Sequence, residues 1–325
     1  MARLLFVFLD GIGLGAADPG RNPLAATWPG LRALAGGDWT AEAWPTGQRG
    51  DVVTAALDAR LGIAGLPQSA TGQTALLTGR NAAAAMGRHY GPWPGPTLQA
   101  MLAAGNLFAD GFASGGALLA NAYPARYLAA LSPPAALRGD ATERRLRRLR
   151  PSAPVAAALA AGLVLADVTA WSAGRAVAAD LDAAGLVPLA EPGGSAGERV
   201  GTRQQARTLA RLAGEHAFTF FDVWSADRAG HGQDVVAAHA FLTRLDAFLP
   251  ALVEALPADV TLVLVSDHGN LEDLSNPRHT LAPVPLLARG PAAAAFAEAR
   301  SLLDVAPAVR SVLATGQAAL QLRTA

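Results

Sequence analysis

Four short runs rich in β-branched, aromatic and leucine residues constrain the fold of this chain most strongly. They are Leu4–Leu9, Phe218–Trp224, Val260–Ser266 and Val284–Arg289. Runs of this kind are typical of strands that are buried on both faces of a parallel sheet. Segments with a helical pattern, such as Val235–Leu256, lie between them. The alternation predicts an α/β fold with a doubly wound, mostly parallel sheet.

Polar residues follow two of these runs directly. Asp10 comes after the first run, and Asp267 and His268 come after the third in the stretch "SDHGN". Ligands of open α/β sheets bind beyond the carboxyl ends of the strands. Two adjacent ionisable side chains at the end of a buried strand must also be bonded to something or desolvated. We therefore expect a functional site at this edge, with Gly269 freeing the backbone for the turn.

Three more acidic and imidazole side chains fit the same site. Asp227 and His231 lie four residues apart in "SADRAGHG", and His279 lies in "RHTLAPVP". Taken singly, Asp10 also reads as the cap of a turn, and Asp227 with His231 as a surface pair. Taken jointly, three Asp and three His favour a metal cluster. The chain has no cysteine, and carboxylate with imidazole suits Zn²⁺ or Mn²⁺ without separating the two.

A hydroxyl group stands at a predicted helix start in "GLPQSATGQTALLTG". Ser69 follows a turn marked by Gly65 and Pro67, and the helix continues through Thr74–Thr78. Unpaired backbone N–H groups at such a position favour an anion such as phosphate, although Ser69 alone also reads as an ordinary N-cap. Two metal ions on the order of 4 Å apart would clamp the attacking and leaving oxygens of a phosphoryl transfer. One of them would activate the Ser69 hydroxyl as a nucleophile.

Composition excludes several classes of partner. The 325 residues carry no net charge, so no positive field points to nucleic acid or to an anionic membrane surface. All 26 basic residues are Arg. The apolar run at the N-terminus is too short for a signal peptide, so we expect a cytoplasmic protein. The oligomeric state is left open.

The middle of the chain reads as an inserted second domain. Pro- and Gly-rich stretches flank weak strands there, which predicts a cap over residues 92–199 and a discontinuous core over residues 1–91 and 200–325. The cap would act as a lid. An Arg-rich segment, Glu143–Pro151, would offer guanidinium groups to a substrate phosphate or lie as a solvated helix face. Our candidate substrate contacts are Gln73, His89, Arg144, Arg148 and Arg228.

The ordered motifs resemble the alkaline phosphatase superfamily, in the branch of cofactor-independent phosphoglycerate mutase and phosphopentomutase. The resemblance rests on "FLDGIG", "DRAGH", "SDHGN", "HTLAPVP" and "SLLDVAPAVRSVLA" in the two outer portions of the chain. It implies an alkaline phosphatase-like core with a smaller inserted α/β cap. Two features differ from the branch: Gln73 stands where its mutases usually have His, and the lysine that phosphoglycerate mutase uses is missing. These differences argue against phosphoglycerate mutase activity itself.

Carried over by residue, the resemblance implies two divalent metal ions, Mn²⁺ or Zn²⁺. One would be held by Asp227, His231 and His279, and the other by Asp10, Asp267 and His268. Ser69 would be the nucleophile, with Thr71 as second choice. The implied activity is phosphatase or phosphomutase chemistry on a small phosphorylated metabolite through a phosphoserine. The alternatives are hydrolysis of phosphodiesters or of sulfate or phosphonate esters, and a non-catalytic metal-binding protein.

Overall fold

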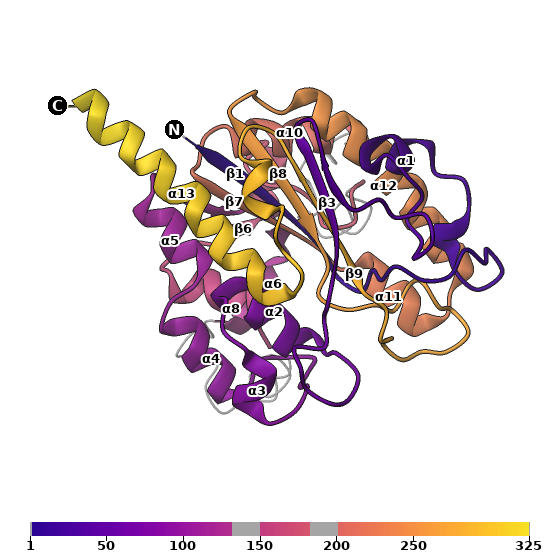
Figure 1. Cartoon of the computed structure of the whole chain (residues 1–325). Coiled ribbons are helices and arrows are strands. Elements are labelled where there is room, and N and C mark those ends of the chain that lie inside the picture. Colours follow the sequence, from indigo (N-terminus) through magenta and orange to yellow (C-terminus); the bar gives the residue numbers. More distant parts are fainter. Residues whose placement is uncertain (1, 132–149, 183–200, 325) are drawn as a thin grey trace, which may run out of the picture.

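A mixed β-sheet runs through the centre of the protein (Figure 1). The computed structural model describes residues 2–131, 150–182 and 201–324. In that part of the chain, seven strands form the sheet in the order β2-β3-β9-β8-β1-β7-β4. The parallel strands are β4 (Ala117–Leu119), β7 (Phe218–Val223), β1 (Arg3–Leu9) and β8 (Val260–Val265). The antiparallel strands are β9 (Val284–Arg289), β3 (Val52–Leu57) and β2 (Gly47–Arg49).

The central strand β1 is apolar throughout because both of its faces are covered. Leu4, Phe6 and Phe8 belong to one hydrophobic core. Their neighbours in the strand, such as Leu5 and Val7, belong to a second core on the opposite face. Helices therefore pack on both sides, and the predicted α/β class with a doubly wound sheet is confirmed.

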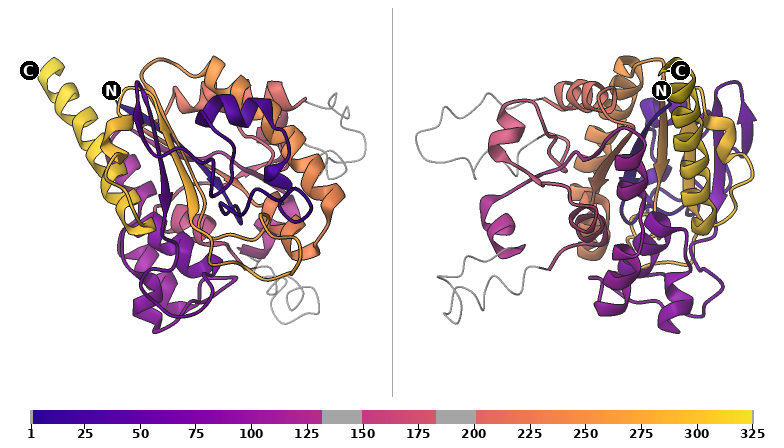
Figure 2. Two further views of the ribbon diagram at one scale, coloured as in Figure 1. Left: turned by 45° about the vertical axis from the view of Figure 1, so that its right-hand side comes forward. Right: turned by 90° about the vertical axis from the view of Figure 1, so that its left-hand side faces the viewer.

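The helices divide between the two faces of the sheet (Figure 2). One face carries α2 (Ser69–Thr78), α3 (Ala82–Met86), α4 (Pro96–Ala103), α5 (Leu107–Ala113), α8 (Ala153–Ala160) and α13 (Leu302–Thr324). The other carries α1 (Pro29–Ala35), α10 (Thr202–Ala213), α11 (Ser225–Gly232) and α12 (Val235–Ala255). Helix α12 is long and apolar enough to cross a membrane, but the apolar side chains that it buries lie in the second core, as in a core helix of a globular protein.

The direction of β9 decides what lies at the functional edge of the sheet. Because β9 runs antiparallel to β8, its first residues lie beside the end of β8, with Val265 opposite Leu286. Strand β3 is antiparallel to β9 in turn, so its last residue, Leu57, lies opposite Val284. The loops that leave β3 and β8 and the loop that enters β9 therefore meet at one edge.

Part of the range predicted as an inserted cap, residues 92–199, lies in the main fold. Strand β4 extends the central sheet beside β7, and α4, α5 and α8 contribute buried residues to the first core. The predicted boundary at residue 92 therefore does not separate these elements from the core. The other elements described in this range are α6 (Ala125–Leu131), the paired strands β5 (Ala122–Tyr123) and β6 (Ala166–Asp167), and α9 (Val168–Ser172).

Candidate metal centre

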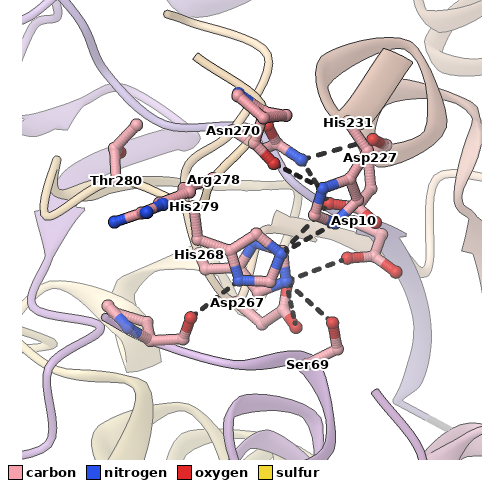
Figure 3. A network of polar contacts seen from close by, with 12 residues as sticks. Asp10, Ser69, Asp227, His231, Asp267, His268, Asn270, Arg278, His279 and Thr280 are labelled. Atoms are coloured by element: carbon pink, nitrogen blue, oxygen red, sulfur yellow. Dashed lines mark hydrogen bonds and ion pairs between the residues drawn. The ribbon is translucent and has the colours of Figure 1, made fainter. Parts of the chain in front are cut away.

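All six predicted metal ligands come together at this edge of the sheet (Figure 3). Asp10 follows β1, and Asp267 and His268 follow β8. Asp227 and His231 lie one turn apart on the same face of α11. His279 lies in the loop that precedes β9. The side chains are brought together by strand ends, because the sheet fixes where each loop begins.

Asp227, His231 and His279 form the first group of possible ligands. The Nε2 atoms of the two imidazoles are 3.1 Å apart. Oδ1 of Asp227 lies 3.5 Å from Nε2 of His279, and its Oδ2 lies 3.4 Å from Nε2 of His231. The two Nε2 atoms and the carboxylate of Asp227 are thus close enough to bind one cation.

Backbone carbonyl groups orient both imidazoles of this group. Nδ1 of His279 is 2.7 Å from the carbonyl oxygen of Pro67, and Nδ1 of His231 is 2.7 Å from that of Pro277. A carbonyl oxygen only accepts, so each Nδ1 carries a proton and each ring turns its Nε2 toward the other. Two Nε2 atoms 3.1 Å apart, beside the carboxylate of Asp227, can donate their lone pairs to one cation. This arrangement fits a metal ion.

The second group surrounds Nε2 of His268. This atom is 3.3 Å from Oδ1 of Asp10, 3.5 Å from Oδ2 of Asp267 and 2.9 Å from Oγ of Ser69. Asp10, Asp227 and His268 offer ligand atoms that all lie within 4.8 Å of one another. Asp227 therefore stands between the two groups, a sharing that the sequence did not predict.

The donor atoms of the second group fit a cation because several have no protein partner. Oδ1 of Asp10 and both carboxylate oxygens of Asp267 are buried without a hydrogen bond. Buried polar atoms normally have partners, so three such atoms in one cluster need an explanation. A divalent cation would compensate the three carboxylates, and the oxygen and imidazole donors match the preferences of Zn²⁺ and Mn²⁺.

The pKa values of the cluster reflect the same crowding of charge. Burial, with the neighbouring carboxylates of Asp267 and Asp227, raises the pKa of Asp10. Burial and the charge of Asp227 raise the pKa of Asp267 to about 8. Burial lowers the pKa of His268 to about 3, with His279 adding to the effect. Without a cation, the cluster thus favours the protonated, neutral forms of Asp10 and Asp267.

Asp227 and His279 shift in the opposite sense because they pair with each other. Burial alone would raise the pKa of Asp227, but the hydrogen bond with His279 and the nearby imidazole of His268 lower it to about 2. Burial alone would lower the pKa of His279, but its contact with Asp227 raises it. Asp227 is therefore the carboxylate that stays ionised in this cluster.

The helix α2 points its N-terminus at the second group. Ser69 is its first residue, and its Oγ contacts His268 as described. The hydroxyl of Thr71 instead donates to the carbonyl oxygen of Gln68 at 3.0 Å. Gly72 lets the helix lie against Asp267, since a methyl group there would be 3.0 Å from Cβ of Asp267. Of the backbone N–H groups in the first turn, that of Thr71 donates to the carbonyl oxygen of Tyr90 at 3.0 Å, which leaves those of Ser69 and Ala70 for a ligand.

Three supporting residues were missed in the sequence. Asn270 donates from Nδ2 to Oδ1 of Asp227 at 2.8 Å. Glu272 is buried and accepts hydrogen bonds from the backbone N–H groups of Gly13 at 3.0 Å and Asn270 at 2.8 Å. Asp222, at the end of β7, is buried near the site, and burial raises its pKa to about 7. The first two lie within the motif "SDHGNLED", where spacing alone gives them no role.

The expected reason for Gly269 is corrected by the structure. The backbone of Gly269 does not adopt the left-handed conformation, whereas Gly11, in the loop after β1, does so with φ of 75°. A side chain on Gly269 would instead lie 2.1 Å from Oε1 of Glu272 and 2.3 Å from Oγ1 of Thr280. Gly269 is required because other atoms fill the space around it.

The predicted substrate contacts divide into three groups. Gln73 donates from Nε2 to Oδ2 of Asp10 at 3.3 Å, and it lines a cavity of about 460 Å³ together with Arg228. His89 places Nε2 3.2 Å from the carbonyl oxygen of Ile63 and is not among the residues that line this cavity or its neighbour of about 580 Å³. Arg144 and Arg148 lie outside the described residues. Ser69 and Asp227 line both cavities.

The fold and site define an α/β protein with a buried Asp and His cluster suited to divalent cations. Residues 2–315 match the family described as the metalloenzyme superfamily. The chain belongs to this superfamily.

Curated relatives match only part of the chain. The 2,3-bisphosphoglycerate-independent phosphoglycerate mutase of Vibrio vulnificus is 35% identical over 96 residues, which are 27% of this chain and 19% of the relative. The enzyme of the same name from Dinoroseobacter shibae is 38% identical over 92 residues, 26% of this chain and 18% of the relative. The match therefore spans about a fifth of the length of these relatives.

Solved structures show the same fold over nearly the whole chain. A mutant of the alkaline phosphatase TAB5 with Mg bound has a TM-score of 0.54 at 11% identity and covers 97% of this chain and 99% of its own. The PH0037 protein of Pyrococcus horikoshii has a TM-score of 0.52 at 12% identity, with coverages of 96% and 97%. At these identities the likeness is one of fold.

Proposed function

We propose that this protein is a divalent-metal-dependent phosphotransfer enzyme that acts on a small phosphorylated compound. The observation that carries the proposal is the position of Ser69, whose Oγ lies 2.9 Å from Nε2 of His268 at the N-terminus of a buried helix. A nucleophilic oxygen, two groups of metal donors and an anion-binding helix end thus share one place. The names of the curated relatives and of the TAB5 phosphatase support the same chemistry.

The ligand sets follow the geometry of the two groups. Asp227, His231 and His279 would hold one cation, and Asp10, Asp267 and His268 would hold the other, with Asp227 between them. Bound there, the cations would polarise the phosphate oxygens and favour the ionised form of the Ser69 hydroxyl. We propose Mn²⁺ or Zn²⁺ for this role.

The chain itself would position the reaction. Ser69 would attack the phosphorus atom, forming the Oγ–P bond as the bond to the leaving alcohol breaks, and the alcohol oxygen would take up a proton. The backbone N–H groups of Ser69 and Ala70, at the start of α2, would hold the phosphate oxygens. A second attack, by water or by another hydroxyl group, would then release Ser69. If water makes this second attack, the enzyme is a phosphatase. If a hydroxyl group of the substrate makes it, the enzyme is a mutase.

Release of phosphate from 4-nitrophenyl phosphate with Mn²⁺ or Zn²⁺ tests the proposal. We expect turnover by the wild type, loss of more than about 1,000-fold in Ser69→Ala, and a phosphoryl adduct on Ser69 in intact-mass spectra. Thr71→Val is the matched control, and it should retain the adduct. An adduct that persists in Ser69→Ala would transfer the role to Thr71. No turnover of phosphate, diester or sulfate esters with any divalent metal would favour a non-catalytic metal-binding protein.

A further inference from the structure

The cavity of about 460 Å³ beside Ser69 has an aromatic wall. Trp93, Tyr123, Tyr127 and Trp224 line it. The rings of Tyr123 and Tyr127 lie at 26° to each other with centroids 5.3 Å apart, and those of Tyr123 and Trp224 lie at 17° with centroids 6.5 Å apart. Since three planes are nearly parallel, their faces point along one direction. A planar ring would add to such a stack in the offset geometry that aromatic groups prefer.

Two buried polar groups of the same cavity have no partner in the described part of the chain. The hydroxyl of Tyr123, a residue only 5% exposed, makes no hydrogen bond. Asp222 is 4% exposed, and only its backbone groups are bonded, to the side chain of Asn121. Buried hydroxyl and carboxyl groups are costly without partners. A bound molecule with hydrogen-bonding substituents would supply them.

Three guanidinium groups complete the lining. Arg126, Arg150 and Arg228 line this cavity, and all three residues are exposed. None of them forms an ion pair with a residue that the structure describes. Together they offer planar donors for a negatively charged group of a ligand. Arg150 is the one arginine of the segment Glu143–Pro151 that the structure describes.

We propose that this cavity binds the leaving group of the substrate, and that this group contains a planar ring with a hydrogen-bonding substituent and a second negative charge. This proposal rests on the proposed phosphotransfer function. The phosphoryl group would lie at Ser69, the ring against Tyr127 and its neighbours, and the substituent beside Asp222 and Tyr123. The arginines would bind the second charge. An aryl group and a nucleobase both have this chemistry.

Three substrates that share a second negative charge test the ring. They are O-phosphotyrosine, adenosine 3′,5′-bisphosphate and the acyclic 3-phosphoglycerate, compared by kcat/KM with Mn²⁺. We expect at least one ring compound to exceed 3-phosphoglycerate by about tenfold. Tyr127→Leu should remove most of this preference, so its loss in kcat/KM should be larger for the ring compound than for 3-phosphoglycerate. The control Phe112→Leu replaces an aromatic side chain that is 67% exposed and does not line the cavity, so it should leave all three values unchanged.

Binding separates this proposal from the proposed function. Quenching of tryptophan fluorescence gives Kd for the same three compounds on Ser69→Ala protein with Mn²⁺, without turnover. Tighter binding of O-phosphotyrosine indicates that the leaving group carries an aryl group, and tighter binding of adenosine 3′,5′-bisphosphate indicates a nucleobase. Two outcomes would contradict the ring proposal alone. One is turnover with equal kcat/KM for the ring and acyclic compounds, and the other is an equal Kd for the ring compounds with and without Tyr127→Leu. If the ring compounds bind more tightly but the wild type turns over none of the three, the result supports the proposed ring-binding cavity. It then contradicts the proposed phosphotransfer function.

Discussion

Glu272 joins three loops that carry proposed metal ligands. Its Oε2 accepts from the N–H of Gly13, in the loop after Asp10, and from the N–H of Asn270, in the loop after His268. Its Oε1 accepts from the hydroxyl of Thr280, next to His279. The carboxylate is 3% exposed, and these hydrogen bonds partly offset the rise in its pKa that burial causes. We infer that Glu272 is a positioning residue.

Replacement of Glu272 tests this role. Glu272→Gln puts an amide NH₂ where an oxygen now accepts, so at least one loop loses its anchor. We expect the affinity for Mn²⁺ to fall by about 10- to 100-fold, measured by competition with a chelator, while the fold is retained. The matched control is Glu298→Gln, whose side chain is 94% exposed. Equal affinities in the two variants would contradict the role.

At this scale the sequence revealed the residues with unusual chemistry but not those that hold them. Asp267 and His268 stood out because two ionisable groups followed a buried run. Glu272 and Asn270 did not, since their partners are backbone N–H groups and a carboxylate that are distant in the sequence. No local pattern records such contacts. Tyr123 and Asp222 escaped notice for the same reason.

Helix α2 is held close to Asp267 by the absence of a side chain at Gly72. Gly72→Ala would ordinarily stabilise a helix by about 1 kcal/mol. Here the added methyl group would lie 3.0 Å from Cβ and 3.2 Å from the carbonyl oxygen of Asp267. We expect little change in Tm but a loss of about tenfold in Mn²⁺ affinity, by the same chelator competition, because the second ligand group is displaced.

Gly201→Ala is the control for this helix variant, since a methyl group at Gly201 meets nothing within 4 Å. It should leave Mn²⁺ affinity unchanged. If Gly72→Ala also binds Mn²⁺ as the wild type does, the packing of α2 against Asp267 does not matter for the site.

The strands were predicted better than their directions. The four runs identified in the sequence became β1, β7, β8 and β9 within one or two residues. Strand β9 was expected to follow the parallel pattern, but a residue's hydrophobicity is the same in either direction, and β9 is antiparallel. Strand β3, "VVTAAL", has too few large apolar residues to stand out. Strand β4 is only three residues long and was assigned to the predicted cap.

Removal of metal should destabilise the whole molecule, because the proposed ligands extend from Asp10 to His279. Ions that bind only the folded state raise its free energy of unfolding. We expect EDTA to lower Tm by about 5–10 °C and Mn²⁺ or Zn²⁺ to restore it. Differential scanning fluorimetry would measure the change. A Tm that is indifferent to EDTA and to added metal would contradict the proposed centre.

The effect of EDTA should also grow between pH 6.5 and pH 8. The pKa of Asp267 is raised from 3.8 to about 8, so the stability gained from its protonated form is lost as pH rises toward 8. The raised pKa of His279 acts in the same direction. The lowered pKa of His268 acts only between about 3 and 6.5 and does not offset this loss. Bound metal would compensate the carboxylates, so Tm with Mn²⁺ should fall less over this interval.

The place of β1 in the middle of the sheet has a consequence for biosynthesis. This strand is made before the other strands of the sheet, yet its two neighbours, β7 and β8, begin only at Phe218 and Val260. For most of translation its apolar faces have no native partner. Such an exposed segment favours aggregation, so we expect the nascent chain to need protection, for example by a chaperone, until β7 and β8 have been synthesised.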